Sequence, residues 1–195
     1  MEVFKNRTWM LILVLALAMA LTRFNHFGSS YALPDASLAV FFLGGLYLSK
    51  FRAALWVFIA LLVEAALVDY YAITAQSVSD WCVTSAYGFL VLAYAAMWFA
   101  GHWFAPRHTL TGKNLLGVFA VATAASIVAF LISNVSFFLF SGRYAEMSAF
   151  EYASRVEQYL GSYIAVALMY VACAVIAHMI SILWKDKAHR GSHVV

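Results

Sequence analysis

Cys82 is the residue whose type and setting most favour chemistry, because it follows a polar stretch between two apolar runs. That stretch, 70–87, is rich in Ser and Thr, contains no Lys or Arg, and brings Asp80, Trp81 and Cys82 to the next apolar run. A cysteine thiolate is a soft ligand for a transition metal, and the N-terminus of a helix would favour the thiolate while Asp80 would oppose it. We therefore expect Cys82 to be the centre of a ligand pocket. A plain buried cysteine is the alternative.

Other polar and aromatic side chains fall at the same end of the expected helices. Asn25 and His26 follow the first apolar run, where they could hydrogen-bond a polar ligand or simply cap the helix. Asp69 should need a partner or water, because a carboxylate is costly at membrane depth. Tyr70 and Tyr87 either line the same cavity or are ordinary aromatic residues of the membrane interface.

Arg155 lies in an acidic and amphipathic segment, 144–159, which we expect to form a short helix on the membrane surface. Its side chain either closes over an outer pocket or pairs with Glu151 or Glu157. Pairing on a solvated face is the default for such a residue.

Several groups have functional and structural explanations. Cys173 is roughly 16 Å deeper than Cys82, too far for a disulfide, and is expected to pack in a helix. Glu64 falls in the middle of an apolar run, at a cost of at least about 2.5 kcal/mol, and is expected to be protonated or hydrogen-bonded. His102 and His178, near the inner ends of two runs, could hold a b-type haem or bind a quinone, or be interfacial residues.

The composition is that of an integral membrane protein. The 195 residues are 65% hydrophobic and only 11% charged, against about 25% charged in soluble domains. A helix of about 17–25 apolar residues crosses the hydrocarbon core. The sequence predicts one all-α domain, 1–195, with no visible repeat and six transmembrane helices at about 8–24, 34–50, 52–71, 82–103, 114–140 and 160–184.

The basic residues predict the orientation of these helices. In a six-helix arrangement, most Lys and Arg fall on one side, and only Arg23, Arg143 and Arg155 fall on the other. The positive-inside rule therefore places both termini in the cytoplasm. Acidic residues are expected on the outer face: Asp35, Asp69, Asp80, Glu146, Glu151 and Glu157. A substrate site should thus open outward.

Two further features concern partners. Ala16 and Ala20, four residues apart in the first apolar run, form a small-residue face that lets helices approach closely. The chain contains no P-loop, dinucleotide fingerprint, G-x-S-x-G or H-E-x-x-H motif. We therefore expect no nucleotide hydrolysis by this chain itself, and no nucleic-acid partner.

Together these features resemble the substrate-binding S-components of energy-coupling factor (ECF) transporters, and among them the BtuM proteins, predicted cobalamin transporters. The matching sequences are Arg-Phe-Asn-His-Phe-Gly at 23–28, Leu-Pro-Asp-Ala-Ser at 33–37 and Ser-Asp-Trp-Cys at 79–82. The second also reads as a helix start. The resemblance covers essentially the whole chain. It implies an S-component-like bundle of six helices in the bacterial inner membrane, with its site facing the periplasm.

The resemblance also implies a function, cobalamin binding and uptake, with Cys82 as the ligand of the corrin cobalt. Cobalamin would be the transported substrate, cobinamide a related one, and no other cofactor is expected. An ECF module of two ATPases and a transmembrane coupling subunit would dock on the Ala16/Ala20 face. Thiol-assisted decyanation of cyanocobalamin is a hypothesis. The alternative class is a haem- or quinone-binding electron carrier that uses His102 and His178. The expected substrate-binding residues are Cys82, Asn25, His26, Asp69, Tyr70, Asp80, Trp81, Tyr87 and Arg155.

Overall fold

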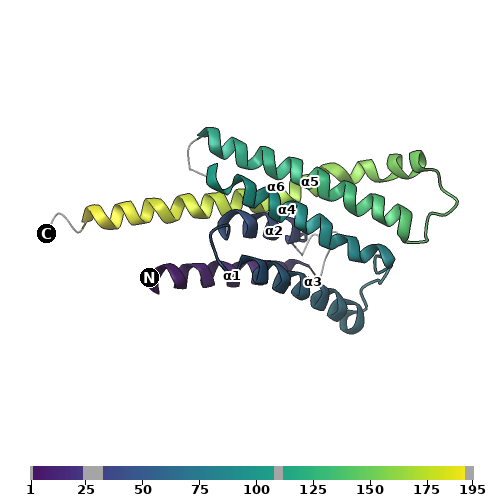
Figure 1. The fold of residues 1–195 in the computed structure, drawn as a ribbon, viewed down its shortest axis with the longest axis horizontal. Helices are drawn as coiled ribbons and strands as arrows, with labels where there is room; N and C mark the ends of the chain where they lie inside the picture. Colours follow the sequence, from purple (N-terminus) through teal and green to yellow (C-terminus); the bar gives the residue numbers. More distant parts are fainter. Residues whose placement is uncertain (1, 24–32, 108–111, 192–195) are drawn as a thin grey trace.

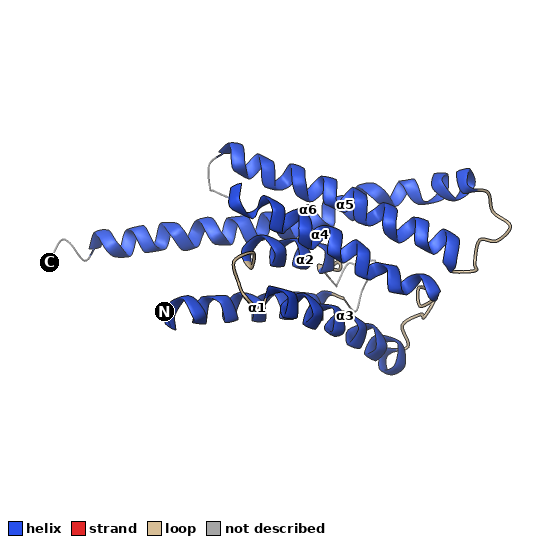
Figure 2. Ribbon diagram, in the orientation of Figure 1, coloured by secondary structure: helices blue, strands red, loops and turns tan. Residues whose placement is uncertain are grey.

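A computed structural model shows an elongated bundle of helices, and it describes residues 2–23, 33–107 and 112–191 (Figure 1). All regular structure in these ranges is helical (Figure 2). The elements are α1 (Glu2–Thr22), α2 (Ser37–Tyr47), α3 (Ala54–Gln76), the short 3₁₀ helix η1 (Ser85–Phe89), α4 (Leu90–Phe104), the 3₁₀ turn η2 (Ala105–Arg107), α5 (Gly112–Phe140) and α6 (Ala149–Gly191).

The short helix α2 is the centre of the packing. Its residues from Ser37 to Leu46 are buried except for Leu38, and it contacts α1, α3, α4 and α6. The ring of Phe41 stacks on Tyr94 of α4, with 4.4 Å between the ring centroids. Gly101 of α4 lies so close to the backbone of Phe42 that a Cβ atom would collide with its carbonyl oxygen. The close approach of α2 and α4 therefore depends on glycine, as at many helix contacts in membranes.

The prediction of a membrane protein is confirmed. Four helical stretches in the described ranges are long and apolar enough to cross a membrane: Ala54–Gln76, Ser85–Arg107, Lys113–Phe140 and Ala149–Trp184. Large apolar side chains face outward around the bundle, as expected in lipid rather than in water; examples are Trp9, Trp56, Phe99, Leu116 and Ile180. The chain is a multi-pass helical membrane protein.

One of the six predicted spans is much shorter as a helix than its apolar run suggests. The run 34–50 contains only the 11 residues of α2, about 16 Å of helix. The first run holds an apolar helix of 17 residues, Asn6–Thr22, as long as the run itself but two residues earlier. The helix start expected at Pro34 falls three residues later, at Ser37. There Asp35 Oδ1 accepts a hydrogen bond from the Ser37 backbone N–H at 2.9 Å.

The prediction of a separate surface helix over 144–159 was wrong. Residues from Ala149 onward are the first turns of α6, which continues without interruption to Gly191. Ser148 and Glu151 form a capping box at its start: the Glu151 carboxylate accepts from the Ser148 N–H at 2.9 Å, and Ser148 Oγ accepts from the Glu151 N–H at 3.2 Å. The polar start of this segment is thus the cap of a long helix.

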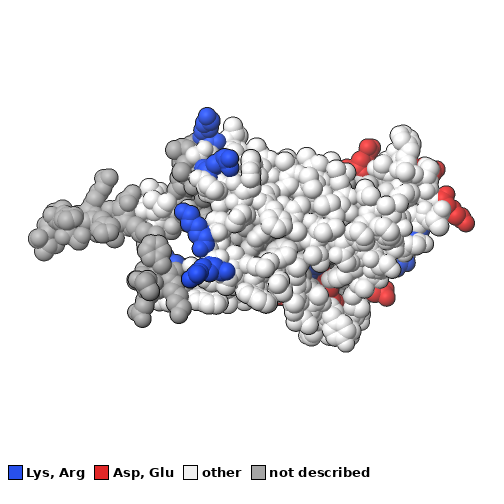
Figure 3. Space-filling view, viewed as in Figure 1, with Lys and Arg blue, Asp and Glu red and all other residues white. Residues whose placement is uncertain are grey.

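Charge is separated between the two ends of the bundle (Figure 3). The end that holds the start of α1 and the end of α6 is basic, and we call it the basic end (Figure 3). The Lys and Arg with described side chains there are Arg7, Lys50, Arg52, Arg107 and Lys113. The opposite end, the acidic end, carries Asp80, Glu146, Glu151 and Glu157. Cys82 lies at the acidic end, in the connection between α3 and η1.

Candidate functional site

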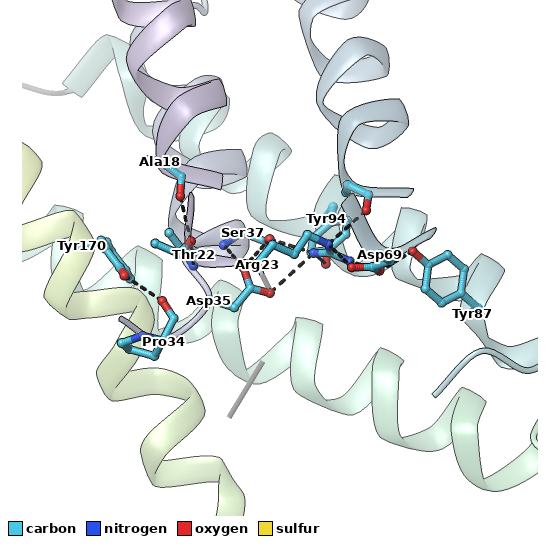
Figure 4. A network of polar contacts seen from close by, with 12 residues as sticks. Ala18, Thr22, Arg23, Pro34, Asp35, Ser37, Asp69, Tyr87, Tyr94 and Tyr170 are labelled. Atoms are coloured by element: carbon cyan, nitrogen blue, oxygen red, sulfur yellow. Dashed lines mark hydrogen bonds and ion pairs between the residues drawn. The ribbon is translucent and has the colours of Figure 1, made fainter. Parts of the chain in front are cut away.

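Arg23 is buried at the C-terminus of α1 and organises the polar interior near the acidic end (Figure 4). Its side chain is 2% exposed. The guanidinium meets Asp69 of α3 in a two-pronged ion pair, with Nε donating to Oδ1 at 2.7 Å and Nη2 donating to Oδ2 at 2.8 Å. Such bidentate pairs are the strongest charge-assisted hydrogen bonds in proteins.

The other terminal nitrogen of Arg23 binds groups from α2 and α4. Nη1 donates to Ser37 Oγ at 2.8 Å and to Tyr94 OH at 2.7 Å, and it lies 3.5 Å from Asp35 Oδ2. Ser37 Oγ in turn donates to Asp35 Oδ1 at 2.6 Å. One cation is therefore surrounded by two carboxylates and two hydroxyl groups from three helices and one connection.

Tyr87 extends this network toward the Cys82 connection. Its OH, on η1, donates to Asp69 Oδ2 at 2.5 Å. Asp69 therefore binds both Arg23 and the 3₁₀ helix that begins three residues after Cys82. We call the interacting residues the Arg23 cluster; they are Arg23, Asp35, Ser37, Asp69, Tyr87 and Tyr94.

Two more hydrogen bonds hold the chain that enters α2. The Ala36 N–H donates to Thr22 Oγ1 at 3.0 Å, and Tyr170 OH of α6 donates to the Pro34 carbonyl oxygen at 2.7 Å (Figure 4). The Arg23 cluster and these bonds together connect α1, α2, α3, α4, η1 and α6. These contacts therefore hold the helices in the acidic half of the bundle in fixed positions relative to one another.

Cys82 belongs to an exposed connection, 77–84, which we call the Cys82 segment. Ser77 begins it in a left-handed conformation (φ 56°) that ends α3, and the Val78 N–H donates back to the Ala72 carbonyl oxygen at 3.1 Å. The prediction that Cys82 stands at a helix N-terminus was wrong, because η1 begins at Ser85, with Thr84 as its cap. The thiol is free and exposed, so the plain buried cysteine is also excluded.

Arg143, in the connection between α5 and α6, contacts the Cys82 segment. Its guanidinium lies over the ring of Trp81, 3.8 Å from the centroid, and its Nε donates to the Trp81 carbonyl oxygen at 3.1 Å. That carbonyl belongs to the peptide group leading into Cys82. Gly142 precedes Arg143 with φ 71°, in the left-handed region that favours glycine.

The electrostatic surroundings of Cys82 favour the neutral thiol. Partial burial raises the pKa of the Cys82 thiol above its ordinary value, Arg143 lowers it, and Asp69 raises it. The thiol therefore carries its proton at neutral pH, and the thiolate expected from a helix N-terminus is not the resting form. A metal that binds the sulfur would displace this proton.

The remaining predicted site residues are distributed around the Cys82 segment. Asp80 and Trp81 are exposed within it, and Tyr70 is exposed on α3. Arg155 is exposed on α6, which is a membrane-crossing helix rather than a surface helix. Asn25 and His26 lie outside the described residues. Within the expected set, Asp69 and Tyr87 are hydrogen-bonded to each other.

The histidines of the alternative function have different surroundings. His178 on α6 contacts α2, with its Nδ1 3.3 Å from Tyr47 OH. His102 on α4 is exposed. A histidine-held haem gains no support from these contacts and stays a prediction. Cys173 is exposed on α6 rather than packed inside.

The small-residue face of α1 is half-buried. Ala16 packs against the core, and Ala20 has the same intermediate exposure. Leu13, Leu17 and Leu21 beside them are exposed. The face therefore lies next to an apolar surface on which another helix could pack.

Sequence reasoning missed two functional candidates, Arg23 and Arg143. The charge pattern identifies Arg23 only as an outer-face exception, although it is the buried partner of Asp69. The signal was present, since an acid and a base at the outer ends of neighbouring helices can remove each other's desolvation cost. Arg143 follows no pattern of sequence, because its contact with Trp81 joins residues 62 positions apart.

Fold and site define a multi-pass membrane protein with an exposed thiol above a buried ionic cluster. A comparison with models of protein families gives no match, and a comparison with curated proteins gives no significant match. The resemblance to BtuM proteins therefore depends on the residues quoted above and stays a prediction.

Proposed function

We propose that this chain is a cobalamin-binding transporter of the S-component type, similar to the BtuM proteins. One observation carries the proposal: Cys82 is a free, exposed thiol at the acidic end, within a segment that also presents Trp81. A sulfur atom in this position is accessible to a metal complex that approaches from outside the membrane. Thiolate sulfur is a soft ligand that suits a transition metal.

The proposed topology has six crossings, with α1 and α2 added to the four longer spans. An even number of crossings agrees with the start of α1 and the end of α6, which lie at the same end of the bundle (Figure 1). Both ends are placed in the cytoplasm, because the basic end should face inward. Cys82 then faces the periplasm of a bacterial inner membrane.

The Cys82 segment offers groups that suit a corrin. A corrin is a broad disc with apolar faces and a fringe of amides. Trp81 and Tyr70 offer exposed aromatic surface, and Asp80 can accept hydrogen bonds from amide N–H groups. Cys82 would supply the axial sulfur to cobalt. Asn25, His26 and Arg155 are assigned to the same ligand on the resemblance alone.

Decyanation of cyanocobalamin would be a ligand exchange at cobalt. The sulfur–cobalt bond forms as the cobalt–carbon bond to cyanide breaks, cyanide keeps the electron pair of that bond, and the thiol proton leaves with it as HCN. Cobalt(III) keeps its oxidation state, so no reductant is needed. Full cyanide release by Cys82→Ser would contradict this step.

Transport by this chain would take its energy from a separate module. The proposal assigns this role to two ATPases and a transmembrane coupling subunit, because the chain has no nucleotide-binding motif of its own. The coupling subunit would pack on α1 along Ala16 and Ala20, beside the exposed Leu13 and Leu17. Exposed Leu13 and Leu21 flank the small-residue pair in the sequence.

Co-elution with cyanocobalamin tests the proposed function. The purified protein in detergent is incubated with the ligand and separated by size exclusion, with Cys82→Ala and Cys173→Ala as variants. We expect the wild type and Cys173→Ala to retain the red ligand and Cys82→Ala to retain at least tenfold less. Cys173 is the matched control, because it is the other free and exposed cysteine. No ligand on the wild type would contradict the proposal.

A further inference from the structure

The contact between Arg143 and Trp81 joins the two connections at the acidic end. One guanidinium makes both parts of it, a stack on the ring at 3.8 Å from the centroid and a hydrogen bond to the carbonyl oxygen at 3.1 Å. Lysine cannot reproduce this arrangement, because a planar fork is needed to stack and donate at once. The other described hydrogen bonds of the Cys82 segment lie within the segment or join it to its chain neighbours α3 and η1, such as Val83 N–H to the Asp80 carbonyl oxygen at 2.8 Å.

We propose that Arg143 is a positioning residue for Cys82: its guanidinium stacks on Trp81 and holds the peptide group that leads into the cysteine. This role rests on the proposed function, since it matters for a sulfur atom that must meet cobalt in a fixed place. Arg143 touches neither cobalt nor the sulfur in this scheme. It fixes the place from which the sulfur reacts.

A second arginine–tryptophan pair lies at the basic end of the bundle. Arg107 lies over the ring of Trp103, 4.6 Å from the centroid, and its Nη1 donates to the Trp103 carbonyl oxygen at 3.0 Å. The chemistry of the two pairs is the same, but Arg107 and Trp103 are four residues apart at the basic end, far from Cys82. Arg107→Gln is therefore the control for removing an arginine–tryptophan stack.

The test is the rate of Cys82 alkylation by iodoacetamide at one high pH, in the full chain in detergent and in a Cys173→Ala background. The rate at this pH reports access to the sulfur. For Arg143→Gln and for Arg143→Lys we expect the rate to increase at least twofold, because neither side chain can stack on Trp81 and hold its carbonyl oxygen at once. The unfolding midpoint in detergent should stay that of the wild type, which separates local release of the segment from loss of the fold. Arg107→Gln should change neither.

An unchanged alkylation rate in Arg143→Gln would overturn the holding role. An increase of the same size in Arg107→Gln would also overturn it, because the effect would then follow the loss of any arginine–tryptophan stack. The assay contains no corrinoid, so failure of cobalamin binding leaves its outcome unaffected, and the reverse holds as well.

Discussion

The Arg23 cluster and the Cys82 segment are neighbours in the acidic half of the molecule, but they are built in opposite ways. The cluster is buried, and its central cation makes hydrogen bonds shorter than 3 Å to side chains on three helices. The segment is exposed, and one guanidinium from a distant connection holds it. Asp69 belongs to the cluster and reaches the segment through Tyr87.

This difference in burial and contacts indicates that the Arg23 cluster and the Cys82 segment have separate roles. Removing one partner of a buried ion pair strongly destabilises the fold. The cluster therefore fixes the positions of the ends of α1, α3 and η1. An exposed segment with few contacts opens at low free energy, which suits a site that must admit a large ligand. Under the proposed function, the rigid Arg23 cluster would support the Cys82 segment, which could rearrange around cobalamin.

The largest effect on the free energy of unfolding should come from disrupting the Arg23 cluster. Asp69→Ala would leave Arg23 buried with its bidentate partner removed, and we expect the free energy of unfolding to fall by about 3–5 kcal/mol. Unfolding in mixed detergent micelles measures this value. Asp80→Ala removes an exposed carboxylate and should change it by less than about 0.5 kcal/mol. Equal effects of the two substitutions would contradict the role of the cluster.

The pH dependence of sulfur–cobalt ligation should come next. The raised pKa of Cys82 means that ligation must displace a proton. Where cyanide stays on cobalt, this proton goes to solvent, so the apparent affinity should increase about tenfold per pH unit below that pKa and level off above it. Exchange of cyanide as HCN would remove this slope, because cyanide then takes up the thiol proton. Titrations of cyanocobalamin at several pH values measure the slope. Cys82→Ala should show weak binding without this slope. A wild-type affinity that falls as pH rises would refute sulfur ligation.

Loosening the link between the two regions should have a smaller effect. Tyr87→Phe removes the hydrogen bond to Asp69 but keeps the ring, and we expect a loss of about 1–2 kcal/mol in the free energy of unfolding. Tyr159→Phe is the control, because Tyr159 is exposed on α6. The same micelle experiment compares them. A neutral Tyr87→Phe would mean that the segment is not tied to the cluster.

The smallest effect on stability should come from the segment itself. Cys82→Ala removes an exposed side chain, so the free energy of unfolding should stay within about 0.5 kcal/mol of the wild-type value. Unfolding curves of the two proteins measure the difference. A loss of more than about 2 kcal/mol would show that the thiol supports the fold, and a loss of cobalamin binding by the variant would then need another explanation.

The sequence predicted the apolar helices and the separation of charge, because both are properties of composition along the chain. The sequence did not predict features that depend on contacts between distant residues. The helix α2 has only 11 residues although its apolar run is longer. The Ser148–Glu151 capping box resembles the start of a short polar helix, but it begins the 43-residue α6. Asp69 was correctly expected to need a partner, but its identity, Arg23, depends on how α1 and α3 pack. Arg143 could not be predicted, since only the fold brings it to Trp81.

The absorbance spectrum of cyanocobalamin bound to the purified protein tests the central claim most directly. Wild type, Cys82→Ala and Cys173→Ala are compared after removal of free ligand. Sulfur ligation predicts a spectrum shifted from that of free cyanocobalamin in the wild type and in Cys173→Ala, and no shifted spectrum in Cys82→Ala. Bound ligand with an unshifted spectrum in the wild type would contradict a cobalt–sulfur bond, and the absence of bound ligand would contradict the corrinoid function itself.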